Sequence, residues 1–184
     1  EVISGVPQGS VLGPLLFLLF VNELPEWIVT NIKMFADDTK IWHNISTDTD
    51  SGTLQDDLDN LVKWSNVWQL KFNPAKCKVM HVGHQCNTRY FIEGDTGRVE
   101  VESVTEERDL GLHFSHSLKP STQCRKVAAK ARRIIGMVRR NFRRLDKKDF
   151  ILIYKTYIRP HLEYCVQSWS PHLIKDIQCL ERVQ

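Results

Sequence analysis

Two adjacent carboxylates, Asp37 and Asp38, are the residues of this sequence best suited to chemistry. They lie between two β-like segments, because residues 31–36 alternate apolar and polar side chains and residues 39–43 are largely β-branched or aromatic. This pattern predicts a hairpin over residues 31–43 with the acids at its tip. Like charges side by side repel, and a hard divalent cation such as Mg²⁺ relieves the repulsion while leaving positions open for phosphate. The pair indicates metal-assisted phosphoryl transfer, although acid pairs are also common in solvated turns.

A second chemical signature lies upstream, where three glycines and two prolines occur within Gly5–Pro14. Glycine allows a ligand to approach the backbone closely and permits unusual φ angles. The same composition also marks an ordinary junction between a loop and a helix. Pro14 suits the first turn of a helix, which we expect to run to about Phe20. The nearly continuous apolar surface of this helix predicts that it is buried against a sheet.

Together the two segments resemble motifs B and C of the palm of a reverse transcriptase. Residues 5–14 are similar to the family's G-x-P-Q-G-S-x-L-G-P block, and residues 35–38 to its F-A-D-D hairpin. The similarity is to polymerases of non-LTR (LINE-type, jockey-like) retrotransposons rather than to retroviral ones. Residues 73–78 resemble motif D, and residues 108–112 resemble the primer-grip motif E. The family's thumb segment is matched by residues 157–164, 169–171 and 180–184.

The resemblance implies an RNA-directed DNA polymerase, in which the 3′-hydroxyl of a primer attacks the α-phosphate of a deoxynucleoside triphosphate. RNA template, DNA primer and nucleotide would be its partners, and two Mg²⁺ ions, with Mn²⁺ as an alternative, its cofactors. Asp37 would be the direct metal ligand, Asp38 a supporting ligand, and Lys76 the residue that assists departure of pyrophosphate. The resemblance further assigns Pro7, Gln8, Gly9 and Ser10 to the template and incoming nucleotide, and Leu110 and Gly111 to the primer grip.

Charge is distributed unevenly along the chain, although the formal net charge is only +3. Residues 119–148 contain twelve Lys or Arg and one Asp, whereas residues 48–59 contain five Asp and no base. Such asymmetry points to a polyanionic partner. The basic residues could equally form a solvated surface or a helix that binds membrane surfaces or calmodulin-type partners. Given the position after motif E, we expect contact with the template–primer backbone from Arg125, Lys126, Arg132, Arg133, Arg139, Arg140, Arg143 and Arg144.

The elements that position these residues indicate an α+β fold: a partial polymerase palm, with a small antiparallel sheet backed by helices, followed by a helical thumb. We place the palm at residues 1–117 and expect a truncated thumb at 118–184. Besides the hairpin, apolar spacing predicts a helix over 54–70, begun by a capping box of Thr53 and Asp56. Strands are expected at 77–82, 89–93, 98–104 and 110–114, with a turn at 94–97. Helices are expected at 121–145, 147–158 and 171–183, the first carrying an apolar stripe opposite its basic residues. The tryptophans are assigned to the core or to an interface.

Other features bound the function more loosely. Five scattered cysteines suit a reducing compartment rather than a disulfide framework. A zinc cluster of Cys77, His81, His84 and Cys86 is an alternative whose spacing matches no usual pattern. No membrane partner is expected, since the apolar run of residues 11–21 is shorter than the roughly 20 residues needed to span a bilayer. The resemblance alone implies a nuclear location, and the oligomeric state stays open.

One departure from the family bears on activity. The motif A aspartate that shares the metals with Asp37 would lie upstream of residue 1, as would the fingers. We therefore expect that these 184 residues belong to a polymerase but do not polymerise alone. The alternatives are a non-catalytic nucleic-acid-binding remnant of a retroelement, and an interaction domain with no role in nucleic-acid binding.

Overall fold

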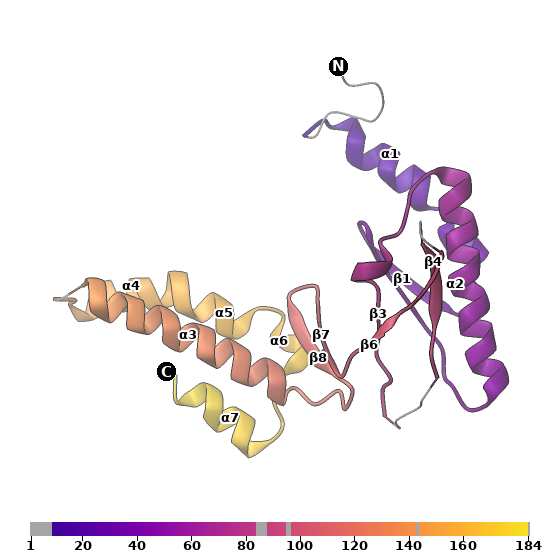
Figure 1. Ribbon diagram of the computed structural model, residues 1–184. Coiled ribbons are helices and arrows are strands. Elements are labelled where there is room, and N and C mark those ends of the chain that lie inside the picture. Colours follow the sequence, from indigo (N-terminus) through magenta and orange to yellow (C-terminus); the bar gives the residue numbers. More distant parts are fainter. Residues whose placement is uncertain (1–8, 84–87, 95–96, 143, 184) are drawn as a thin grey trace. The chain divides into compact units, whose positions relative to one another are not determined.

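The computed structural model describes residues 9–83, 88–94, 97–142 and 144–183 (Figure 1). The chain forms two compact units. The first comprises Glu1–Val79 and Asn87–Ser103, and the second comprises Met80–Cys86 and Val104–Gln184. Helices and short, mainly antiparallel strand pairs occur together, which confirms the α+β class. The units divide near residue 103, whereas the division into palm and thumb at residue 117 stays a prediction.

In the part that the structure describes, the first unit contains two helices, two 3₁₀ turns and three strand pairs. Its elements are α1 (Leu12–Val21), η1 (Leu24–Trp27), β1 (Asn31–Phe35), β2 (Asp38–Trp42), α2 (Asp48–Trp68), η2 (Pro74–Lys76), β3 (Lys78–Val79), β4 (Phe91–Gly94), β5 (Gly97–Glu100) and β6 (Glu102–Ser103). The pairs β1–β2 and β4–β5 are antiparallel hairpins, and β3 pairs with β6 in parallel. Of the turn predicted at 94–97, residues 95 and 96 lie outside the described part.

The β1–β2 hairpin confirms the predicted position of the two acids. Alternation sends Ile32, Met34 and Ile41 toward a core formed with Leu61 and Trp64 of α2. A strand with one apolar face must bury that face, so the register of the hairpin is fixed by this packing.

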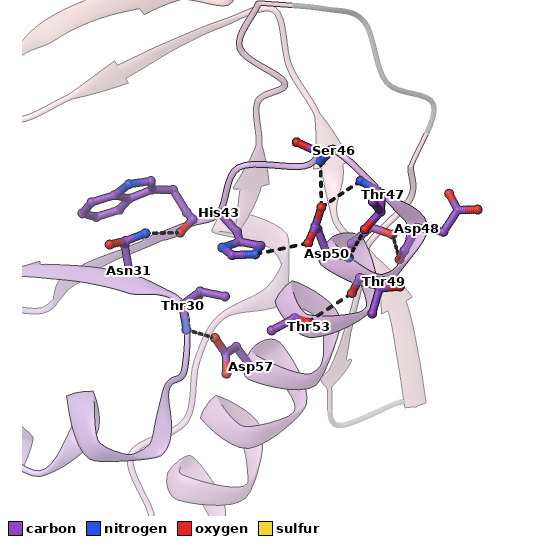
Figure 2. A network of polar contacts seen from close by, with 12 residues as sticks. Thr30, Asn31, His43, Ser46, Thr47, Asp48, Thr49, Asp50, Thr53 and Asp57 are labelled. Carbon is purple, nitrogen blue, oxygen red and sulfur yellow. Dashed lines mark hydrogen bonds and ion pairs between the residues drawn. The ribbon is translucent and has the colours of Figure 1, made fainter.

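Helix α2 begins earlier than the periodicity predicted. Its capping box consists of Thr47 and Asp50: the Thr47 hydroxyl accepts from the Asp50 amide at 3.3 Å, and the Asp50 carboxylate accepts from the Thr47 amide at 2.8 Å (Figure 2). Backbone hydrogen bonds from Ser46 and Thr47 hold the pKa of Asp50 below its ordinary value. The prediction of a cap at Thr53 is wrong, because the Thr53 hydroxyl donates to the Thr49 carbonyl inside the helix. The first turn carries no apolar side chain, so hydrophobic spacing could not reveal it.

A second core lies on the same helix, where Leu54 and Leu58 of α2 pack against Tyr90, Ile92 and Val101. The Gln55 side chain joins the two parts by accepting from the Phe91 amide and donating to the Phe91 carbonyl, both at 2.8 Å. Helix α2 thus supports both hairpins of the first unit.

Helix α1 contradicts the expectation of deep burial. Val21 is buried, Phe17 packs against the same core and Phe20 contacts Trp68 at a ring-centroid distance of 4.8 Å. Leu12, Leu15, Leu16, Leu18 and Leu19 are exposed. Among the described residues, the first unit covers only the side of α1 that carries Phe17, Phe20 and Val21. Within the described residues, no helix combines the length and the apolar character needed to cross a bilayer.

The second unit joins one hairpin to a group of helices. Its elements are β7 (Glu106–Asp109), β8 (Leu112–Ser115), α3 (Ser121–Asn141), α4 (Lys147–Ile153), the π-helical turn η3 (Tyr154–Ile158), α5 (Arg159–Glu163), α6 (Val166–Trp169) and α7 (Ile174–Glu181). Ala128 and Ala131 of α3 are fully buried against Ile158, Leu162 and Val183. This packing confirms the apolar stripe predicted for the long basic helix.

Several predicted boundaries are wrong. The strand predicted at 77–82 is only β3, the stretch 98–104 is divided between β5 and β6, and the long helix ends at Asn141 rather than at residue 145. The helix expected at 147–158 becomes α4 and η3, and the last predicted helix is limited to α7. Strand β7 was not predicted, because its four charged residues have no apolar alternation.

Candidate functional site

The tip of the β1–β2 hairpin presents both acids to solvent. Phe35 pairs with Asp38, so Ala36 and Asp37 form a two-residue connection. Ala36 has a φ of 52°, in the left-handed region that residues other than glycine rarely adopt. Both carboxylates are exposed, and within the described part of the chain neither makes a hydrogen bond or an ion pair. Unpaired carboxylate oxygens beside a strained backbone are available to a cation.

The donor set at the tip fits a hard divalent ion only in part. Mg²⁺ is commonly held by one or two carboxylates together with water and substrate phosphates, which matches Asp37 and Asp38. Across the ranges that the structure describes, no group of three His, Cys, Asp or Glu could hold a metal ion. This finding also covers Cys77 and His81 of the alternative zinc cluster, while His84 and Cys86 lie outside the described residues.

The solvent face of the hairpin carries aromatic and basic side chains beside the acids. Directly paired residues share a face, so Phe35 and Asp38 lie on the same side as Lys33 and Lys40. Trp42 lies on this side too and is 44% exposed, so it lies outside the core and an interface stays the prediction for it, whereas Trp64 and Trp169 are buried as expected. The sequence did not single out this face, because Lys33 and Lys40 fit an ordinary alternation of polar and apolar residues. Only the strand register shows that they share a face with Phe35 and Asp38.

The glycine-rich segment is described in part. Gly9 has a φ of 88°, and the Ser10 hydroxyl accepts a hydrogen bond from the Gly13 amide at 3.1 Å at the beginning of α1. Pro14 lies in the first turn of that helix, as predicted. The candidate residues Pro7 and Gln8 lie outside the described part. What is described supports a loop-to-helix junction and leaves the nucleotide-binding role as a prediction.

Lys76 lies on the short turn η2 and is exposed. Asn73 fixes this turn, because its side-chain oxygen accepts from the Ala75 amide at 3.1 Å and its carbonyl accepts from the Lys76 amide at 3.0 Å. The neighbouring Lys78 forms an ion pair with Glu102 on β6, across the parallel strand pair. Lys76 therefore projects from an anchored backbone, and its catalytic role stays a prediction.

The predicted primer-grip residues form the turn of the β7–β8 hairpin. Asp109 pairs with Leu112, which leaves Leu110 and Gly111 as the two connecting residues. Their φ angles are 46° and 87°, and two successive positive φ angles are the signature of a type I′ hairpin turn. Residues 110 and 111 thus form a hairpin turn of defined backbone conformation in the second unit.

The basic residues of α3 differ in how strongly they are engaged. Arg125 donates to the Thr122 hydroxyl at 3.2 Å, Lys126 lies 3.2 Å from His113 Nδ1, and Arg132 donates to the Cys179 carbonyl at 3.1 Å. Burial, together with the positive charges of Lys126 and Arg108, lowers the pKa of His113. Such a neutral imidazole can accept from the ammonium group.

Three other candidates on α3 remain at the solvent surface: Arg133, Arg139 and Arg140 are all exposed. Arg144 follows the end of the helix and is also exposed, while Arg143 lies outside the described residues. The long basic helix therefore exists as predicted, but part of its charge is already used in contacts within the second unit.

Comparisons with known proteins show which family this chain resembles. The family described as "Reverse transcriptase (RNA-dependent DNA polymerase)" matches residues 2–114. A Drosophila melanogaster protein, "Probable RNA-directed DNA polymerase from transposon X-element", is 24% identical over an alignment that covers 100% of this chain and 21% of that protein. "RNA-directed DNA polymerase from mobile element jockey" of Drosophila funebris is 30% identical, covering 91% of this chain and 19% of that protein.

A third relative, "Probable RNA-directed DNA polymerase from transposon BS" of Drosophila melanogaster, is 27% identical, covering 91% of this chain and 20% of that protein. The chain spans about a fifth of the length of these relatives. No significant match was found among solved structures. The residues that match the family include α1, both acids of the β1–β2 hairpin and the β7–β8 turn. The chain therefore belongs to the reverse transcriptase (RNA-dependent DNA polymerase) family, in its LINE-type, jockey-like branch.

Proposed function

We propose that this chain supplies part of the palm and thumb of an RNA-directed DNA polymerase that transfers nucleotides from deoxynucleoside triphosphates to a primer 3′-hydroxyl. The observation that carries the proposal is the β1–β2 hairpin. Its exposed tip presents Asp37 and Asp38, neither paired with any described residue, inside the segment that matches the family. A purely structural turn would not require two unpaired carboxylates beside a residue with positive φ.

Asp37 would hold divalent metal directly, and Asp38, the first residue of β2, would support it. Bound there, Mg²⁺ or Mn²⁺ would activate the attacking oxygen and stabilise the leaving one. Two acids are fewer than such a site commonly uses, so we propose that a further carboxylate comes from outside these 184 residues. Lys76 would add positive charge near the departing pyrophosphate.

RNA template and DNA primer would contact three parts of the chain. Pro7, Gln8, Gly9 and Ser10 would line the nascent base pair, and the Leu110–Gly111 turn would hold the primer end. The exposed arginines of α3 would contact phosphates, which recognise shape and charge but not sequence. The helix of 21 residues would extend about 32 Å at 1.5 Å per residue, enough to follow several phosphates.

Primer extension on poly-rA/oligo-dT tests this proposal. We expect the 184 residues alone to incorporate no nucleotide above background. A chimera that joins the preceding segment of the jockey polymerase to Glu1 should extend the primer. Asp37→Asn in that chimera should lower the rate by at least about 100-fold, the scale of losing one preorganised charge at a reacting centre. Extension that persists in this variant would refute the assignment of Asp37.

The second candidate is a nucleic-acid-binding remnant without catalysis, which the basic surface of α3 favours. It predicts that binding of an RNA–DNA hybrid is sensitive to salt and indifferent to Asp37→Asn. A chimera that binds hybrid in a salt-dependent manner but never extends the primer would favour this candidate over the polymerase.

A further inference from the structure

One tyrosine ties the β7–β8 turn to a segment far along the chain. The Tyr164 hydroxyl donates a hydrogen bond of 3.1 Å to the Leu110 carbonyl, across a sequence separation of 54 residues. The Tyr164 ring also lies against Gly111, because a Cβ built on that glycine would be 3.3 Å from the ring carbon Cε1. A single side chain thus contacts both residues of the turn.

Tyr164 is itself held at its backbone. Its amide donates to the Pro160 carbonyl at 3.0 Å, and its carbonyl accepts from Trp169 Nε1 at 2.8 Å. Trp169 is 5% exposed and packs in one core with Leu112, the residue that follows the turn, and with Cys124 of α3. Within the second unit, Tyr164 therefore contacts the β7–β8 turn directly and is linked through Trp169 to strand β8, which follows that turn.

Burial does not account for the position of Tyr164. Its side chain is 57% exposed, so moving it away from the turn would expose little additional apolar surface. The turn, by contrast, needs support, because Leu110 holds a φ of 46°, which brings its Cβ close to the following carbonyl oxygen. The contact with Tyr164 stabilises this conformation through one directed hydrogen bond and one contact between the ring and Gly111.

We propose that Tyr164 is a positioning residue that holds the Leu110–Gly111 turn where it meets the 3′ end of a nucleic-acid primer. This inference rests on the proposed function, since it takes the turn to be the primer grip. Tyr164 itself need not touch nucleic acid. Its hydroxyl fixes the conformation of the turn, and the turn makes the contact.

The test compares Tyr164→Phe with Tyr157→Phe in the 184-residue chain. Tyr157 is similarly exposed, and within the described residues its hydroxyl makes no hydrogen bond. Amide hydrogen exchange over residues 106–115 should be about fivefold faster in Tyr164→Phe, the effect of losing one neutral hydrogen bond, and unchanged in Tyr157→Phe. Equal exchange in both variants would overturn the inference.

A second measurement separates positioning from general support. An RNA–DNA hybrid with a recessed primer 3′ end is compared with a continuous hybrid that has no recessed end. Tyr164→Phe should weaken binding to the recessed hybrid about threefold and leave the continuous hybrid unchanged, whereas a merely structural loss would weaken both equally and overturn the inference. If the wild type binds neither hybrid while exchange still responds to Tyr164→Phe, the contact is real but the proposed function fails, and with it the positioning role.

Discussion

The buried carboxylate of Asp57 provides the sharpest prediction about how the β1–β2 hairpin is supported. Asp57 lies on α2 and is 1% exposed. Its two oxygens accept hydrogen bonds from the Val29 amide at 3.0 Å and the Thr30 amide at 2.7 Å, immediately before β1; Figure 2 shows the bond to Thr30. The strand that leads to Asp37 is thereby anchored to the helix behind it.

Asp57→Ala would leave both amides without their acceptor. The Thr30 amide is buried, and leaving it unsatisfied costs about 1–3 kcal/mol, whereas Val29 is 82% exposed and water can replace the acceptor of its amide at a loss of about 1 kcal/mol. The free energy of unfolding should therefore fall by about 2–4 kcal/mol. Asp57→Asn keeps one acceptor and turns an NH₂ group toward the other amide, so about half of that loss is expected. Asp56→Asn is the matched control, because Asp56 is exposed on the same helix, and should change stability by less than about 0.5 kcal/mol.

Urea unfolding followed by tryptophan fluorescence measures these differences, since Trp64 is buried on the same helix. With a slope of about 2 kcal/mol per molar urea, a loss of 3 kcal/mol lowers the midpoint by about 1.5 M. An Asp57→Ala midpoint within about 0.2 M of Asp56→Asn would refute the reasoning, because it would show that the anchor adds nothing to the stability of the unit.

Three further predictions follow from the same structure. Thr47→Ala should lower the free energy of unfolding by about 1 kcal/mol in urea melts and Thr53→Ala by clearly less, because only Thr47 caps α2; equal losses would contradict the cap. Replacing Arg139 and Arg140 by Gln should reduce the salt-dependence slope of hybrid binding by about 1.4–1.8 in filter-binding titrations, whereas Arg89→Gln in the first unit should not; a slope unchanged by the double variant would remove α3 from the interface. Burial raises the pKa of the Cys124 thiol to about 11, so thiol labelling at pH 8 should modify the half-buried Cys165 at least about 100-fold faster than Cys124; comparable rates would show that the core around Cys124 is open.

The sequence predicted the parts of the fold whose signal is local. Alternation across residues 31–43 and the apolar stripe of α3 each contain enough periodic side chains to define an element, and both are present in the structure. The beginning of α2 and the whole of β7 were missed because their residues are polar and carry no periodic apolar signal. The spacing of polar and apolar residues favoured Thr53 as the N-cap of α2. Only the extended backbone conformation of Thr47 identifies it as the actual N-cap.

The candidate site was predictable where motifs coincide with turns. The acids occupy the tip of the β1–β2 hairpin, as the sequence indicated, whereas residues 110 and 111, predicted as the start of a strand over 110–114, form the β7–β8 turn. The supports of these turns were not predictable, because Asp57 and Tyr164 act through contacts made 27 and 54 residues away. Nothing in the local sequence distinguishes these side chains from an ordinary helix acid and an ordinary surface tyrosine.

The most direct test of the central claim is Mn²⁺ binding by the β1–β2 hairpin, followed by the loss of the free-ion electron paramagnetic resonance signal. The account predicts that the wild-type chain binds Mn²⁺ and that Asp37→Asn weakens this binding by at least about tenfold, as expected when one of two carboxylate ligands is removed. Asp56→Asn, which removes an exposed acid elsewhere in the first unit, should bind like the wild type. Equal affinity of Asp37→Asn and the wild type would contradict the assignment of the hairpin tip as a metal site.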